Sequence, residues 1–159
     1  MTLQWKSHNS GMFQPSQHDV RKFFCATHQR QQAGLPLEPM QALAARWVDE
    51  HPEYHTDLSD VEKALAAVYT VDEGRTNPFL HLSMHLSIEE QIAIDQPTGI
   101  RQAVALLAQR KQSLHTAHHE VMECLGEMIW ASQRSGLPPD GQAYLEAVRQ
   151  RATRGPTSR

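Results

Sequence analysis

"NPFLHLSMHLSIEEQIAID", residues 77–95, is the stretch that decides the fold. Asn77 is a preferred helix cap, and Pro78 suits the first helical position because a backbone N–H there would have no helical partner. No glycine or proline interrupts the residues that follow, and Pro97 ends the pattern. The sequence therefore predicts a long helix over 79–95.

Apolar residues at helical spacing recur along the rest of the chain, in segments separated by glycine, proline and polar turns. Ser16 and Asp19 resemble a cap pair at the start of one segment, and Ser59 and Glu62 have the spacing of a capping box at another. Gly136 closes the longest segment. The predicted helices span about 16–30, 38–51, 59–69, 79–95, 100–112, 115–134 and 140–150.

No segment shows the sustained alternation of β-branched residues that predicts strands. The sequence therefore predicts an all-α protein, a single-domain helical bundle of about six or seven helices. A chain of 159 residues is long enough to bury a sizeable core without disulfides or an obligatory metal. We assign residues 15–152 to the bundle, residues 1–14 to a flexible N-terminal extension and residues 153–159 to a disordered tail.

Composition excludes some classes of function. A net charge of -3 lacks the positive balance that is typical of nucleic-acid-binding proteins. No apolar run reaches the roughly 18–20 residues of a membrane span, and residues 1–11 lack the apolar core of a secretory signal. We expect a cytoplasmic protein without nucleic-acid or membrane partners, whereas a protein partner or a homo-oligomer stays open. Cys25 and Cys124 are expected to be reduced thiols.

The chain has ten histidines, and their spacing stands out. A His-x3-His-x3-Glu triplet occurs twice, as His81, His85 and Glu89 and again as His115, His119 and Glu123. Residues four apart lie on one face of a helix, close enough for two side chains to bind one ion. Random placement of ten histidines gives roughly 0.6 pairs at spacing four, and this chain has three.

One predicted helix separates the two that carry these triplets, so an up-down-up arrangement makes them parallel and lets the two faces meet. Imidazole nitrogens and carboxylate oxygens are ligands for zinc, iron or manganese. We therefore predict a transition-metal site for one ion or two, built from all six triplet residues, with the glutamates as ligands or as partners of the ligating histidines. An open coordination position would activate water or dioxygen, a closed one would be structural, and the sequence leaves both open.

A second interpretation of the same residues requires no metal. Glutamates such as Glu89 and Glu123 would satisfy buried imidazoles and form a structural polar seam. The protein would then be a helical adaptor or regulatory protein that binds a partner through exposed apolar residues such as Trp5, Phe13 and Trp130.

A third pair at spacing four, His51 and His55, brackets Pro52 and has no acidic residue at the next step. This context favours a turn at a helix end over a ligand role. Two enzymatic interpretations are weaker still. "HEVME" at 119–123 resembles the zincin motif with its second histidine missing, and would make Glu120 a general base. Cys124 as a nucleophile is disfavoured by its apolar neighbours.

Longer motifs connect the chain to a known family. The segments "HPEYH", "NPFLHLSMHLSI", "DQPTGIR" and "HEVMECLGEMIWASQRSGLPPD" together resemble the bacterial domain-of-unknown-function family 1841, over about Met12 to Arg149. Members typically begin near the equivalent of "MFQPS", so the resemblance implies that residues 1–11 are an extension, and either Met1 or Met12 can be the start. It further implies a bacterial cytosolic protein whose signature includes the histidine segments, and it supplies no reaction.

Overall fold

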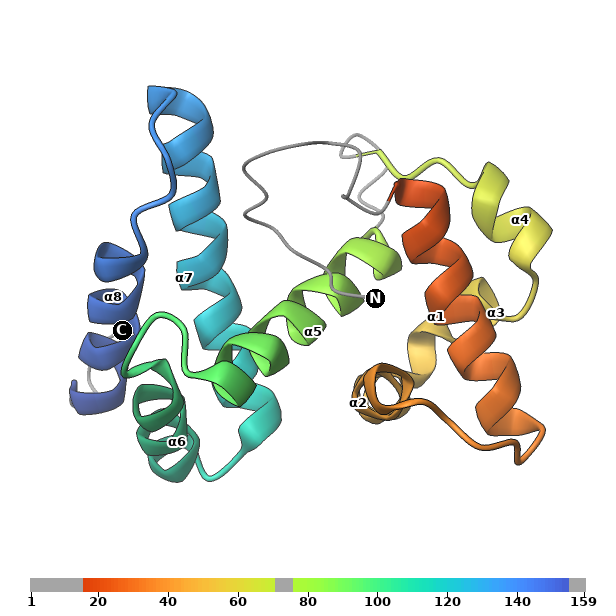
Figure 1. Cartoon of the computed structure of the whole chain (residues 1–159), viewed down its shortest axis with the longest axis horizontal. Helices are drawn as coiled ribbons and strands as arrows, with labels where there is room; N and C mark the ends of the chain where they lie inside the picture. Colours follow the sequence, from red (N-terminus) through yellow and green to blue (C-terminus); the bar gives the residue numbers. More distant parts are fainter. Residues whose placement is uncertain (1–15, 71–75, 155–159) are drawn as a thin grey trace. The chain divides into compact units, whose positions relative to one another are not determined.

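The computed structural model describes residues 16–70 and 76–154 (Figure 1). In this part of the chain every regular element is helical, which confirms the predicted all-α class. The elements are, in order, α1 (Gln17–Gln32), α2 (Pro39–Asp49), the 3-10 helix η2 (Pro52–Tyr54), α3 (His55–Leu58), α4 (Val61–Ala66), α5 (Pro78–Ile94), α6 (Ile100–Lys111), α7 (Leu114–Ser135) and α8 (Gly141–Thr153). The α-helix that the sequence did not predict is α3, a single turn that directly follows η2.

The described helices form two compact units, divided between residues 87 and 88, inside α5. The first unit contains α1 to α4, η2 and the N-terminal part of α5, and the second contains the rest. The histidine triplet of α5 is thereby divided, because His81 and His85 belong to the first unit and Glu89 to the second.

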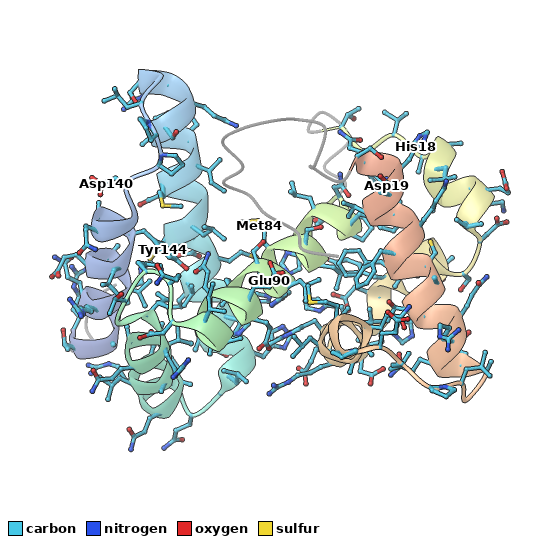
Figure 2. All side chains as sticks on the ribbon, viewed as in Figure 1. His18, Asp19, Met84, Glu90, Asp140 and Tyr144 are labelled. Atoms are coloured by element: carbon cyan, nitrogen blue, oxygen red, sulfur yellow. The ribbon has the colours of Figure 1, made fainter. Side chains whose placement is uncertain are left out.

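In the first unit, α1 packs against α2, α3 and α4, and Figure 1 shows α1 beside α4. Ser16 and Asp19 form the capping box of α1 as predicted, and Asp19 is labelled at the start of that helix in Figure 2. The start of α2 was also predicted correctly, with Glu38 before Pro39. Large apolar side chains fill the core of this unit: Phe24, Trp47, Val48, Leu58, Phe79 and Leu82.

The predicted helix over 59–69 is shorter than expected, and its cap is a different residue. Asp60 caps α4, because its carboxylate accepts hydrogen bonds from the backbone N–H groups of Glu62 and Lys63 at 3.0 and 3.3 Å. Ser59, the predicted cap, instead donates its hydroxyl to the carbonyl of His55 at 2.6 Å. A charged acceptor one residue further on makes the stronger cap, so the prediction of Ser59 was wrong.

Arg21 joins three elements of the first unit. Its guanidinium donates hydrogen bonds to the carbonyls of Ala64 at 2.6 Å and Ala67 at 2.8 Å, at the end of α4. It also lies 5.5 Å from the ring centroid of Tyr69 and 5.3 Å from that of Phe79 in α5. Carbonyls at a helix end need partners from outside the helix, and this buried side chain supplies them.

α5 begins as predicted. The side-chain oxygen of Asn77 accepts hydrogen bonds from the backbone N–H groups of Phe79 at 3.0 Å and Leu80 at 3.1 Å. With Pro78 in the first helical position, this cap fixes where the helix starts. The positions of His81 and His85 on the helix follow from that start.

In the second unit, α6, α7 and α8 pack on one another (Figure 1). α7 is the longest helix and ends as predicted at Gly136, whose φ of 75° lies in the left-handed region. Asp140 caps α8 by accepting from the Ala143 N–H at 3.0 Å, and Tyr144 donates its hydroxyl to Gln91 at 2.5 Å (Figure 2). The core of this unit is apolar: Ile100, Val104, Leu107, Val121, Leu125, Leu145 and Val148.

The predicted limits of the bundle fall mostly outside the described residues. The extension at 1–14, with Met1 and Met12, and all but two residues of the predicted tail lie there, as does most of the loop predicted around 70–77. At the C-terminal end α8 includes Thr153, which the prediction had placed in the tail. None of the helices seen in the two described ranges is long and apolar enough to cross a membrane. The cytoplasmic location stays a prediction.

Candidate metal centre

Three histidines of the first unit come together from two places in the chain. His51 follows the end of α2, while His81 and His85 lie one turn apart on α5. Each offers a ring nitrogen that lies within 4.8 Å of those of the other two. The three ring centroids are 4.8 to 4.9 Å apart. The pair predicted on α5 is therefore joined by a histidine that the sequence analysis had assigned to a turn.

A backbone hydrogen bond fixes the proton of His51. Its Nδ1 atom lies 2.8 Å from the carbonyl oxygen of Trp47, one turn earlier in the chain. A carbonyl can only accept, so Nδ1 carries the hydrogen and Nε2 carries the lone pair of the neutral ring. A hydrogen bond of this kind orients an imidazole and raises its basicity as a metal ligand.

The ring of Trp47 also holds His85. The two rings are stacked with centroids 4.1 Å apart and an interplanar angle of 9°. His85 is fully buried and Trp47 is 2% exposed, so neither ring has room to turn freely. Trp47 thus positions one ligand candidate through its backbone and a second through its side chain.

Tyr54 forms another wall of the cluster. Its ring stacks on His51 at 5.1 Å and meets His81 edge to face at 5.9 Å. Burial, followed by the nearby charges of Glu53 and Asp57, raises the pKa of Tyr54 to about 12. The side chain is therefore a neutral phenol at physiological pH, and it adds no charge to the cluster.

The three histidines differ in exposure. His85 and His51 are buried, at 0% and 2% exposed, whereas His81 is partly exposed. The cluster therefore combines two buried rings with one that is partly exposed.

The arrangement is suited to one transition-metal ion. Imidazole nitrogens bind zinc, iron, copper and nickel, at about 2.0–2.1 Å for zinc. Two nitrogens bound to a tetrahedral zinc are about 3.3 Å apart. The ring nitrogens of these histidines lie within 4.8 Å of one another, so each distance needs to shorten by no more than about 1.5 Å for all three to bind one ion. Small changes of side-chain torsion make such a shift accessible.

The predicted ligands on α7 form a pair of their own in the second unit. His115 and His119 are both partly buried, with ring centroids 4.5 Å apart at an angle of 70°. Their common face confirms the helical spacing inferred from the sequence. The meeting of this face with the histidines of α5 stays a prediction.

The two predicted glutamates have other interactions. Glu123 accepts a hydrogen bond from Arg151 at 2.6 Å, and its side chain is 67% exposed. Glu89 lies 3.9 Å from Nε2 of the buried His118, a histidine to which the sequence analysis gave no role. Glu123 thus forms an ion pair and Glu89 lies near a histidine within the second unit, and their predicted role toward a metal stays untested.

His51 is the residue that sequence reasoning missed. Its signal was present as a histidine pair at spacing four, but Pro52 indicated a turn and no acid followed. The turn exists, as η2, and it is what directs His51 toward α5. His55 fits the earlier interpretation, since its Nε2 lies 3.0 Å from the Val48 carbonyl and its ring packs against His28.

The two enzymatic alternatives gain no support from the second unit. Glu120 forms ion pairs with Lys111 at 3.1 Å and Arg151 at 3.4 Å, which is unlike a general base. Cys124 is buried, and desolvation raises the pKa of its thiol, so little nucleophilic thiolate forms.

The apolar residues predicted to dock a partner are only partly described. Trp130 is 57% exposed and stacks with the guanidinium of Arg134, 4.2 Å from its ring centroid. Trp5 and Phe13 lie outside the described residues. Exposure of one tryptophan does not by itself define a docking surface.

Comparison with known proteins places the chain in a family. Residues 16–150 match the family described as Domain of unknown function (DUF1841), and the chain belongs to it. The curated proteins and the solved structures gave no significant match. The family description states no activity, so the function has to be inferred from the histidine cluster.

Proposed function

We propose that this protein binds a transition-metal ion through His51, His81 and His85. The observation that carries the proposal is the convergence of three imidazoles from two separate elements. Imidazole nitrogens that lie this close together can bind one transition-metal ion jointly.

The ligand chemistry favours zinc or iron over manganese. All three donors are neutral imidazoles, which suit zinc, iron, copper and nickel, whereas manganese prefers carboxylate and water oxygens. The sequence analysis had included manganese because it counted Glu89 and Glu123 among the ligands. Glu123 forms an ion pair with Arg151, and Glu89 lies 3.9 Å from His118, both within the second unit.

The larger ligand set predicted from the sequence extends this proposal. The repeat of the His-x3-His spacing on α7 supports a further imidazole from His119 or His115. In that case His119→Ala lowers the metal affinity of the full chain, while the three histidines of the first unit still bind. Whether the site is catalytic depends on the coordination position that these ligands leave open.

Metal content tests the proposal. The full chain is purified without a histidine tag, incubated with zinc, freed of excess ion, and analysed by inductively coupled plasma mass spectrometry. We expect about one zinc per chain, and loss of that zinc in His85→Ala. His18→Ala is the matched control, because His18 is an exposed histidine of α1 outside the cluster.

A wild-type chain that retains neither zinc nor iron, and whose melting is unaffected by a chelator, would contradict the proposal. The histidines would then form the structural polar seam of the alternative interpretation. Equal zinc loss in His85→Ala and His18→Ala would mean nonspecific binding and would contradict it as well.

A further inference from the structure

His28 is a buried imidazole on α1 for which the described part of the chain supplies no hydrogen-bond partner. The residue is 2% exposed, and neither Nδ1 nor Nε2 has a donor or acceptor within hydrogen-bond distance in residues 16–70 and 76–154. Buried polar atoms nearly always have such a partner, because leaving one unpaired costs stability. Packing alone therefore does not account for a histidine at this position.

A ring contact joins His28 to α3. The rings of His28 and His55 have centroids 4.7 Å apart and an interplanar angle of 39°. The Nε2 atom of His55 lies 3.0 Å from the Val48 carbonyl oxygen, so Nε2 carries the hydrogen of the neutral ring. A proton added to His28 would place a positive charge against this second imidazole, which has no negative charge to offset it.

The acid that acts on His28 is poorly placed to neutralise such a charge. Asp49, at the end of α2, is exposed, and its carboxylate already accepts hydrogen bonds from the Gln31 amide at 2.9 and 3.1 Å. Burial, followed by the neighbouring imidazole of α3, outweighs this acid and lowers the pKa of His28. The other ionisable side chains on the helices packed against α1 take no part in this shift: Arg46, Asp57, Glu62 and Lys63.

We propose that His28 makes the packing of α1 against α2 and α3 sensitive to acid, so that this contact opens when the ring takes up a proton. A neutral ring fits the buried position, whereas a charged ring needs water or a close acid. The open form binds the proton more readily than the packed form. Each pH unit below about 6.5, the ordinary histidine pKa, therefore favours opening up to about tenfold. The inference does not depend on the metal site.

Cys25 provides a local probe of this opening. It lies on α1 one turn before His28, is 1% exposed, and burial raises the pKa of its thiol to about 11. Its reaction with a thiol reagent therefore requires α1 to open. The full chain carries Cys124→Ala to remove the other cysteine, and EDTA keeps it free of metal. Labelling by dithiodipyridine is followed from about pH 7.5 to about pH 5.5, and the rate in urea-unfolded chain at each pH corrects for thiol reactivity.

A substitution that cannot take up a proton isolates the contribution of His28. His28→Leu, made in the same background, replaces the ring with an apolar side chain. We expect the corrected rate to rise toward acid pH by a factor up to about tenfold larger with His28 than with leucine. His18→Leu is the matched control, because His18 is an exposed histidine at the start of the same helix (Figure 2). Its rise should equal that of the unsubstituted background.

Two outcomes of the labelling experiment overturn the proposal. One is a rise of equal size in His28→Leu and in its background, and the other is a background rate that stays constant over the whole pH range. If His28→Leu does not fold, the ring signal of His28 in the nuclear magnetic resonance spectrum of the wild type decides. We expect that signal to titrate below the ordinary histidine range, and titration at or above about pH 6.5 in the folded chain overturns the proposal.

Discussion

Trp47 positions two of the three histidines by different means. Its carbonyl fixes the proton of His51, and its indole ring stacks on His85. A substitution at Trp47 therefore keeps the first of these interactions and removes the second, because every residue has a carbonyl. This division explains how one buried residue can hold rings that come from α5 and from the turn after α2.

Asp95 is another residue that organises its surroundings. It has a left-handed backbone with φ of 54°, a conformation that aspartate tolerates better than most residues. Its carboxylate accepts hydrogen bonds from the N–H groups of Arg101 at 2.9 Å and Gly99 at 3.2 Å, at the start of α6. The bond from Arg101 is the main cause that lowers the pKa of Asp95.

The lowered pKa of Asp95 predicts a pH-dependent effect of Asp95→Asn. A carboxyl group with a lower pKa in the folded state contributes stability above its unfolded pKa of about 3.9, and loses it as pH falls through the folded pKa. We expect Asp95→Asn to be less stable than the wild type near pH 7. The difference in the free energy of unfolding should shrink as the pH falls from the unfolded pKa of Asp95 through its lower folded pKa. Urea unfolding at several pH values measures it, and a pH-independent difference would contradict the assignment.

At the scale of elements, α7 owes its end to a single glycine. Gly136 has φ of 75°, and a Cβ atom built there would meet nothing within 4 Å. Gly126 lies inside the same helix, also with no atom within 4 Å of an added Cβ, but without a positive φ. The two positions differ in backbone conformation, but both have room for a Cβ atom.

Alanine at these two positions should therefore have opposite effects. Gly136→Ala should lower the free energy of unfolding by about 1–2 kcal/mol, because a side chain is strained in the left-handed region. Gly126→Ala should raise it by about 0.5–1 kcal/mol, because alanine is the better helix former. Chemical denaturation measures both changes, and effects of the same sign would show that α7 does not end as described.

Most helices were predictable because their signals are local. Asn77 with Pro78, Ser16 with Asp19, and Gly136 act through neighbours within four residues. The cap of α4 was missed because Ser59 and Asp60 are both good cap residues. Only the packed structure shows which one accepts the backbone hydrogen bonds.

The candidate site was predictable only in part, for a different reason. The spacing of His81 and His85 is a property of one helix and is visible in the sequence. His51 joins them through a turn and a contact across 30 residues, which no local pattern encodes. The roles predicted for Glu89 and Glu123 likewise depend on tertiary partners such as His118 and Arg151.

At the scale of the whole molecule, we propose that three histidines of the first unit hold one metal ion. The ion would join the turn after α2 to α5, so binding should stabilise the folded chain. At a free zinc concentration of 100 times the dissociation constant, the expected gain is about 2.7 kcal/mol. The histidine pair on α7 could add a ligand to this site, but the three histidines of the first unit do not require it to bind the ion.

His51→Ala and His55→Ala, compared in one assay, provide the sharpest test of the proposed metal site. Both histidines bond a backbone carbonyl in the same unit, but only His51 belongs to the ligand group. Zinc affinity is measured by competition with a chromophoric chelator. We expect zinc affinity to fall about 100-fold or more in His51→Ala and to stay near the wild-type value in His55→Ala. Equal affinities in the two variants would contradict it.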